Sequence, residues 1–194
     1  MAHESEEFVS ELGDAIEKYC GQSFHLVNIG SNDGWEAARL ALRFPSARLT
    51  LIDAMPIAGP PAVYRAVIGA TTGQSVFYEM PDTCLSSNYH RGQSTKVECQ
   101  EYRLPDWLGA NGLPAPTALF IDTEGTTGDI LNGACDLLAG VNFICAEVQV
   151  EMIYPGCMLL GEVDELLATH GLVRVPGGYP WGCQGNYFWA RLAS

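Results

Sequence analysis

Short apolar segments alternate with amphipathic segments of helix length along most of the 194-residue chain, and this alternation limits the possible folds most strongly. A protein with this pattern is expected to be α/β with a mostly parallel sheet. Apolar or alternating runs predict strands, and a helical spacing of apolar side chains predicts helices. The expected strands are 25–29, 49–53, 64–68, 73–79, 96–102, 118–122 and 143–150, and the expected helices are 6–19, 35–44, 104–108, 128–138 and 162–169.

The C-terminal part of the chain breaks the alternation. The last two expected strands, 172–175 and 186–192, have no helix between them and are joined by a loop rich in glycine and aromatic residues, 176–185. Strands joined without a crossover should be antiparallel. The sequence therefore predicts a mostly parallel sheet that ends in an antiparallel hairpin.

Length and composition favour one domain over residues 1–194, with an N-terminal helix in 1–20 and a sheet core in 26–192, because no linker interrupts the chain. The 10 basic and 23 acidic residues give a formal charge of −13, which disfavours nucleic acid and anionic membrane surfaces as partners.

The seven cysteines lack CxxC spacing and are expected as reduced thiols. With no signal peptide and no apolar run of about 20 residues, a cytoplasmic protein is expected.

The segment LVNIGSNDGWEAARLALRF, residues 26–44, predicts a strand, a glycine turn and a helix. Gly30 and Gly34 flank Ser31, Asn32 and Asp33, so the spacing is GxxxG and not the GxGxxG of dinucleotide sites. Asp33 would oppose a diphosphate, whereas it suits a ligand with positive charge or hydroxyl groups. S-adenosylmethionine has an α-ammonium group, a sulfonium and a ribose, so the turn is predicted to bind this cofactor. A purely structural turn between strand and helix remains the alternative.

Asp53 ends the second expected strand, 23 residues after Gly30 and just before Ala54. An acid at this position binds ribose hydroxyls in nucleotide-binding folds, so Asp53 and Ala54 are predicted to contact the cofactor. The diol contact does not distinguish a nicotinamide cofactor from S-adenosylmethionine. Alternatively, Asp53 is a helix cap or a solvated strand end.

Two stretches together resemble a known family. NIGSNDG looks like motif I of S-adenosylmethionine-dependent methyltransferases, and FIDTEGTTGDILNGACDLL followed by FICAEV is similar to the FkbM-type group. The resemblance spans residues 26 to about 191. It implies a Rossmann-like methyltransferase fold with a seven-stranded sheet and a C-terminal antiparallel hairpin. It also implies O-methylation of hydroxyl groups on small molecules and sugars.

The resemblance assigns roles position by position. Gly30, Asn32 and Gly34 fall on the motif I loop, Asp53 falls on the ribose acid, and the D-x-E-G element falls on Asp122, Glu124 and Gly125.

Three positions depart from the family pattern. Asn28 stands where many members have Asp, which leaves an amide for the amino-acid end of the cofactor, and Asp53 stands where Glu is common. Thr126, Thr127 and Gly128 replace the usual G-A-E, which puts the start of the following helix in doubt.

Methyl transfer to an alcohol needs a base or a metal to remove the proton, whereas transfer to a carboxylate needs neither. Asp122 and Glu147 end consecutive strands and are the candidate catalytic acids; Asp122 is also a candidate cofactor ligand.

Glu147 lies inside an apolar run, so it is expected to have a partner, a raised pKa or a metal. If Mg²⁺ binds, Asp122 and Glu147 are its expected ligands. Alternatively, Glu147 is a hydrogen-bonded strand-end acid and Glu124 accepts helix N-terminal amides.

The polar loop 80–93 carries further candidates. His90 is the histidine best placed to act as a base, and Ser86 and Ser87 are predicted to bind the cofactor carboxylate or the substrate. A surface histidine is the alternative for His90.

The aromatic side chains Tyr179, Trp181 and Tyr187 are expected either to form a wall for the acceptor or to pack the hairpin over the core.

The sequence thus predicts an S-adenosylmethionine-dependent methyltransferase that most readily methylates a hydroxyl, or a carboxylate, of a small-molecule acceptor. An NAD(P)-dependent oxidoreductase and a non-catalytic cofactor-binding module of the same fold remain alternatives. Because no large insert is evident to complete an acceptor site, a homodimer is possible.

Overall fold

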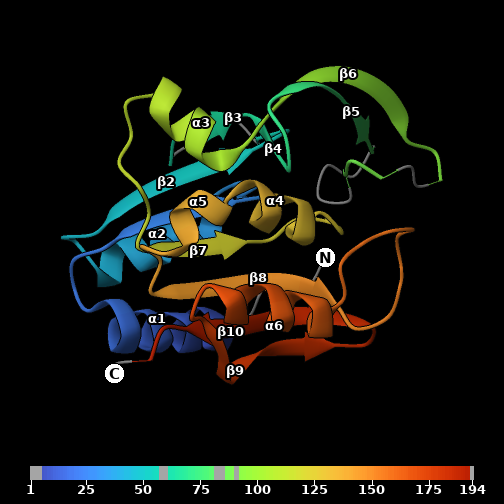
Figure 1. The fold of residues 1–194 in the computed structure, drawn as a ribbon. Helices are drawn as coiled ribbons and strands as arrows, with labels where there is room; N and C mark the ends of the chain where they lie inside the picture. The colour runs from blue at the N-terminus through green and yellow to red at the C-terminus, as the bar shows by residue number, and fades with distance from the viewer. Residues whose placement is uncertain (1–5, 57–60, 81–85, 90–91, 193–194) are drawn as a thin grey trace.

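A seven-stranded sheet forms the centre of the protein in a computed structural model, which describes residues 6–56, 61–80, 86–89 and 92–192 (Figure 1). Strands β3, β2, β1, β7 and β8 are parallel to one another, and β10 runs antiparallel to both β8 and β9. This confirms the predicted Rossmann-like methyltransferase sheet with its C-terminal hairpin. In sheet order the strands are β3 (Tyr64–Arg65), β2 (Arg48–Asp53), β1 (His25–Ile29), β7 (Ala118–Ile121), β8 (Phe143–Gln149), β10 (Gln184–Ala190) and β9 (Val173–Trp181).

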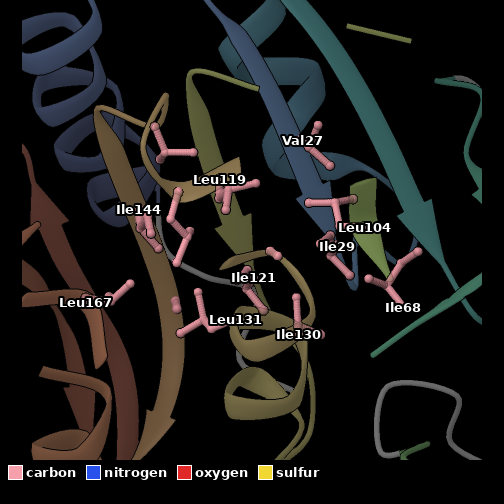
Figure 2. Close-up of a cluster of buried hydrophobic side chains, with 14 of the residues drawn as sticks. Val27, Ile29, Ile68, Leu104, Leu119, Ile121, Ile130, Leu131, Ile144 and Leu167 are labelled. Carbon is pink, nitrogen blue, oxygen red and sulfur yellow. The ribbon is translucent and has the colours of Figure 1, made fainter. Parts of the chain in front are cut away.

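Helices cover both faces of this sheet. Alternate side chains of a strand point to opposite faces, so Leu26 packs with the first two helices while its neighbour Val27 packs with the later ones. The first two are α1 (Glu6–Cys20) and α2 (Trp35–Arg43); the later ones are α3 (Leu104–Ala110), α4 (Thr127–Gly133), α5 (Cys135–Leu138) and α6 (Leu160–Thr169). Figure 2 shows Ile130 and Leu131 of α4 beside Ile121 of β7, in the core of the second face.

A second sheet lies beside the edge of the first, next to β2 and α3 (Figure 1). Its three strands are β4 (Val67–Ile68), β6 (Thr95–Tyr102) and β5 (Gly73–Glu79), in that order. The predicted single strand 64–68 is therefore wrong: Tyr64–Arg65 pairs with β2, and Val67–Ile68 pairs with β6. An apolar pattern indicates extended backbone but does not specify the partner strand, so the switch between sheets could not be predicted from it.

Two other expectations need correction. The helix predicted at 128–138 is interrupted at Ala134, whose φ of −96° and ψ of 0° separate α4 from α5. The loop predicted at 176–185 is mostly strand, because β9 continues to Trp181 and pairs with β10 beyond a bulge. Gly177 and Gly178, with φ of 116° and 102°, supply the backbone conformation that this bulge needs.

Among the described helices none is long and apolar enough to cross a membrane. The six cysteines that the structure describes are free thiols, in agreement with the predicted reduced state; Cys84 lies outside the described residues.

Candidate functional site

The turn after β1 requires glycine at both ends. Gly30 has a φ of 83°, and a Cβ atom there would lie 1.9 Å from the backbone oxygen of Asp122 on the neighbouring strand. Gly34 has a φ of 73°, and a Cβ atom there would lie 2.8 Å from Cγ of Pro61. Asn32 between them also adopts a positive φ of 48°. The turn is therefore a tight structure, pressed against the end of β7, at the edge where doubly wound sheets bind ligands.

Asp53 holds this turn in place. One carboxylate oxygen accepts a hydrogen bond from the Asn32 amide at 2.8 Å, and the other accepts from the Met55 amide at 2.6 Å. Burial raises the pKa of Asp53, and the two amide hydrogen bonds act in the opposite direction. The carbonyl of Ala54 next to it accepts from the Arg65 side chain at 3.2 Å. Contact of Asp53 and Ala54 with a ribose remains a prediction.

Two polar residues of the turn also have structural partners. The buried Ser31 donates its hydroxyl to the carbonyl of Ile52 at 3.3 Å. The exposed Asp33 accepts from the Trp35 amide at 3.0 Å, at the start of α2. An exposed carboxylate at the N-terminal end of α2 would oppose a diphosphate bound there, and the predicted contact of Asp33 with a cofactor stays a prediction.

Asn28 on β1 is 1 % exposed, and its Oδ1 atom has no hydrogen-bond partner among the described residues. A buried amide oxygen without a donor is costly, so this atom is available for a donor from a ligand. An ammonium group is such a donor. The arrangement fits the predicted contact with the amino-acid end of the cofactor.

Several carboxyl groups from different elements meet near the strand ends. Burial, followed by the charges of Glu36, Glu124 and Asp53, raises the pKa of Asp122 to about 7. Burial also raises the pKa of Glu147 to about 9, with contributions from Asp122 and Glu124. Every neighbouring charge that shifts these two groups is negative. The site therefore favours a cationic ligand.

Glu147 has one side-chain partner: its Oε2 accepts from the Gln184 amide at 3.3 Å, while its Oε1 is buried without a partner among the described residues. Its backbone oxygen accepts from the hydroxyl of Thr127 at 2.6 Å. This bond anchors the start of α4 at Thr127.

The loop before β6 lies against the D-x-E-G turn. The Ser87 hydroxyl donates to the carbonyl of Glu124 at 2.5 Å, and the ring of Tyr89 stacks on that of Tyr154, with centroids 5.6 Å apart. Tyr154 in turn donates its hydroxyl to the Glu124 carboxylate. Tyr154 was not among the predicted site residues, because it follows β8 in a segment without a recognisable motif.

The other candidates of this loop have different outcomes. The Ser86 hydroxyl oxygen accepts a hydrogen bond from the Met80 amide at 2.9 Å, which is a contact within the loop. His90 lies outside the described residues, and its predicted role as a base stays a prediction.

The aromatic residues of the hairpin divide between the two faces. Tyr179 and Trp181 lie together with ring centroids 5.8 Å apart, whereas Tyr187 packs against Trp189 in the core on the α6 side. Tyr187 is therefore not part of an aromatic wall with the other two.

Across the described ranges, no group of three or more His, Cys, Asp or Glu side chains has the arrangement of a metal site. The structure gives no support to Asp122 and Glu147 as magnesium ligands.

No known protein-family model matches the chain. By sequence it is similar to the 2-O-methyltransferase NoeI of Sinorhizobium fredii, with 23 % identity over 189 residues, covering 83 % of this chain and 76 % of that protein. By structure it is similar to the 1,6-didemethyltoxoflavin-N1-methyltransferase of Burkholderia thailandensis, solved with S-adenosylhomocysteine. The TM-score is 0.50 at 12 % identity, covering 98 % and 80 % of the two chains.

A second similar structure is the precorrin-6y C5,15-methyltransferase of Geobacter metallireducens, with a TM-score of 0.50 at 12 % identity, covering 97 % and 90 % of the two chains. These likenesses show the Rossmann-like methyltransferase fold. Together with the sequence match they support the predicted enzyme class, an S-adenosylmethionine-dependent methyltransferase. The relatives are named for methylation at different kinds of atom, so the fold alone does not identify the accepting atom.

Proposed function

We propose that this protein transfers the methyl group of S-adenosylmethionine to a hydroxyl group of a small-molecule acceptor. The observation that carries the cofactor assignment is the group of carboxyls at the strand ends, where the pKa of Asp122 is raised to about 7 by burial and then by Glu36, Glu124 and Asp53. A sulfonium and an ammonium would neutralise this charge, whereas the diphosphate of NAD(P) would add to it. The nicotinamide alternative is therefore disfavoured.

The chain offers specific groups to each part of the cofactor. The Gly30–Gly34 turn allows the close approach of a ligand, Asn28 has an unpartnered amide oxygen for the ammonium group, and Asp53 has lone pairs left for ribose hydroxyls. When bound, S-adenosylmethionine supplies an electrophilic methyl group. The task of the protein is then to align an acceptor oxygen with that group.

A hydroxyl acceptor must also lose its proton. Asp122, with a pKa of about 7, is half ionised near neutral pH, which is the range where a general base works well. Glu147, with a pKa of about 9, is mostly protonated there and suits a hydrogen-bonding role better. We assign Asp122 as the base, with His90 as the other candidate.

The choice of oxygen as the accepting atom rests on the sequence relative, which is named as a 2-O-methyltransferase. The FkbM-type resemblance includes the L-x-G element, Leu131 to Gly133. A Cβ atom at Gly133 would lie 2.0 Å from the backbone oxygen of Gly69, so this position admits only glycine without a shift of the backbone.

Calorimetry with S-adenosylmethionine and S-adenosylhomocysteine tests the cofactor assignment. We expect Asp53→Ala to weaken binding by roughly tenfold or more, because it removes both the ribose acceptor and the tie to the Asn32 amide. Asp53→Asn is the matched control: it keeps one acceptor oxygen and should lose less. If Asp53→Ala binds the cofactor as tightly as the wild type does, Asp53 does not contribute to the cofactor site. If the folded wild type binds neither compound, the proposed cofactor is wrong.

A non-catalytic module would bind the cofactor but transfer no methyl group. Release of S-adenosylhomocysteine, measured against a panel of hydroxylated and carboxylated small molecules, separates the enzyme from the module. We expect turnover with a hydroxylated compound, and we expect Asp122→Asn to lower kcat with little change in cofactor affinity near pH 6.

A further inference from the structure

Two tyrosine rings from separate loops lie together against the D-x-E-G turn. Tyr89 precedes β6 and Tyr154 follows β8, and their rings stack with centroids 5.6 Å apart and an angle of 24° between the ring planes. Tyr154 is 3 % exposed. A Cβ atom at Gly125 would lie 2.5 Å from Cδ2 of Tyr154, so this ring packs directly on the backbone of the turn.

Glu124 of this turn is held from two sides. Its carboxylate accepts a hydrogen bond from the Tyr154 hydroxyl, and its backbone oxygen accepts from the Ser87 hydroxyl at 2.5 Å. Gly125 follows with a φ of 76°, a conformation that favours glycine. The side chain and the main chain of Glu124 are therefore held by two loops that are far apart in the sequence.

The second sheet holds the loop that carries Tyr89. Ser87 and Tyr78 of β5 exchange two backbone hydrogen bonds, at 2.7 and 3.1 Å. The side-chain amide of Asn88 donates to the buried Glu101 of β6 at 3.4 Å. The next residue is Tyr89, so the position of its ring depends on contacts with the second sheet.

Tyr89 also contacts the first turn of α4. Its hydroxyl donates to the Asp129 carboxylate at 3.4 Å. Burial, followed by the charges of Asp129 and Cys157, raises the pKa of Tyr89 to about 12, so the hydroxyl keeps its proton at physiological pH. His90 and Arg91, which follow in the chain, lie outside the described residues. The ring of Tyr89 is thus held at both ends and supports Tyr154.

The charge of Glu124 acts on neighbouring carboxyl groups. Five such groups gather at the strand ends and are called the acidic group: Glu36, Asp53, Asp122, Glu124 and Glu147. Burial is the main cause of the raised pKa of Asp122 and of Glu147, and the charge of Glu124 adds to it in both cases. This contribution depends on the distance between the carboxylates and on the water between them. The position of the Glu124 carboxylate therefore affects the proton on Asp122.

We propose that Tyr154 is a positioning residue for the methyl transfer: its hydroxyl holds the Glu124 carboxylate beside Asp122, and the ring of Tyr89 holds Tyr154. The inference rests on the proposed function, because it takes Asp122 as the base. Tyr154 acts through Glu124 and is not itself a catalytic residue. The second sheet then has a role at the site, because it fixes the loop that carries Tyr89.

The proposal has a physical consequence for Asp122. Without the Tyr154 hydroxyl, the Glu124 carboxylate is free to turn toward water, where its charge is screened. Asp122 then has less negative charge nearby and loses its proton at a lower pH. A tyrosine that only packs would leave this titration unchanged when replaced by phenylalanine, because phenylalanine keeps the ring and its contacts. The titration of Asp122 therefore distinguishes positioning from packing.

The test is an NMR titration of the ligand-free full chain with ¹³C-labelled aspartate carboxyl groups. The signal of Asp122 is identified by its absence in Asp122→Asn. We expect a midpoint near pH 7 in the wild type and a midpoint lower by roughly 0.3–1 pH unit in Tyr154→Phe. Tyr19→Phe is the control: Tyr19 stacks on Phe143 in the core on the α1 side, and its loss should leave the midpoint unchanged.

A double variant tests whether Tyr154 acts through Glu124. Glu124→Gln removes the charge itself and should lower the midpoint at least as much as Tyr154→Phe does. In the presence of Glu124→Gln, the tyrosine change should add little, because the two changes remove the same interaction. The proposal is overturned by a midpoint that is unchanged or higher in folded Tyr154→Phe. It is also overturned if the tyrosine change has the same effect with and without Glu124.

Two variants of Tyr89 provide an independent test that leaves Tyr154 in place. Tyr89→Leu removes the ring that supports Tyr154, so the midpoint of Asp122 should fall. Tyr89→Phe keeps the stacked ring and should titrate as the wild type does. If Tyr154→Phe does not fold, this pair decides: a wild-type midpoint in Tyr89→Leu would contradict the proposal.

Calorimetry with S-adenosylmethionine separates this inference from the proposed function. The affinity is expected to rise with pH as Asp122 loses its proton, and in Tyr154→Phe this rise should shift to lower pH together with the NMR midpoint. If the folded wild type does not bind S-adenosylmethionine, the proposed function is wrong. The NMR titration needs no ligand, so it still decides whether Tyr154 holds the Glu124 charge beside Asp122.

Discussion

At the residue scale, Glu147 shows how burial changes a side chain. Its position inside the apolar run FICAEVQV predicted a partner, a raised pKa or a metal. The structure provides the first two: the amide of Gln184 lies 3.3 Å from Oε2, and the pKa is raised to about 9, first by burial and then by Asp122 and Glu124. Glu147 is therefore mostly a neutral acid at physiological pH.

This raised pKa makes stability depend on pH. In the unfolded chain a glutamate releases its proton near pH 4.3, whereas folded Glu147 holds it up to about pH 9. Between these values unfolding releases a proton, so the free energy of unfolding falls as pH rises, by up to about 1.4 kcal/mol per pH unit for one proton. We expect Glu147→Gln, which stays neutral, to remove a large part of this slope between pH 6 and 8.5, as measured by urea unfolding.

The matched control is Glu98→Gln, an exposed glutamate of β6 outside the acidic group, which should keep the wild-type slope. A wild-type free energy of unfolding that stays flat or rises over this range would contradict the raised pKa of Glu147.

At the element scale, close backbone contacts decide where helices and strands end. The continuous helix predicted at 128–138 breaks after Gly133, where the chain passes within contact of Gly69 from the second sheet. On β9, two glycines allow a bulge, and a predicted loop becomes strand. In both cases a segment distant in sequence sets the local structure.

Two helical glycines test this explanation. Gly133→Ala places a Cβ atom 2.0 Å from the backbone oxygen of Gly69, so we expect a loss of about 1–3 kcal/mol in the free energy of unfolding. Gly161→Ala in α6 meets no atom within 4 Å and should stabilise the protein by about 0.5–1 kcal/mol. Chemical denaturation of the two variants gives both values, and equal effects would refute the contact at Gly133.

At the scale of the whole molecule, the five residues of the acidic group come from four elements or their ends. Glu36 lies on α2, Asp53 ends β2, Asp122 and Glu124 follow β7, and Glu147 lies on β8. Parallel strands bring their carboxyl ends to one edge, and the chain, with its charge of −13, adds a negative field there.

We expect the affinity for S-adenosylmethionine to rise several-fold from pH 5.5 to 7.5. Asp122 loses its proton over this range because its pKa is about 7, and its negative charge then attracts the sulfonium. The α-ammonium group of the ligand stays mostly protonated over the same range. Calorimetry should show a weaker dependence for S-adenosylhomocysteine, which lacks the sulfonium, and for Asp122→Asn. If the affinity for S-adenosylmethionine does not depend on pH, the charge of Asp122 does not act on the bound cofactor.

Much of the site was predictable from local sequence, because glycine turns and strand-end acids depend on neighbouring residues. The positive φ values of Gly30 and Gly34 confirm the predicted tight turn. The partners of these residues were not predictable: Asp53 ties the turn through Asn32, and Tyr154 reaches Glu124 from 30 residues away. Hydrogen bonds across such separations leave no periodic signal in the sequence.

The sequence by itself determined the class of sheet, the glycine turn and the acidic strand ends, because hydrophobic period and backbone freedom are local properties. Tertiary structure alone decided that residues 64–68 divide between two sheets, and that Glu147 and Gln149 share a face with Gln184 and Asn186. Strand pairing joins segments far apart in the chain. The free energy that selects one pairing comes from burial and contacts that exist only once the sheet has formed.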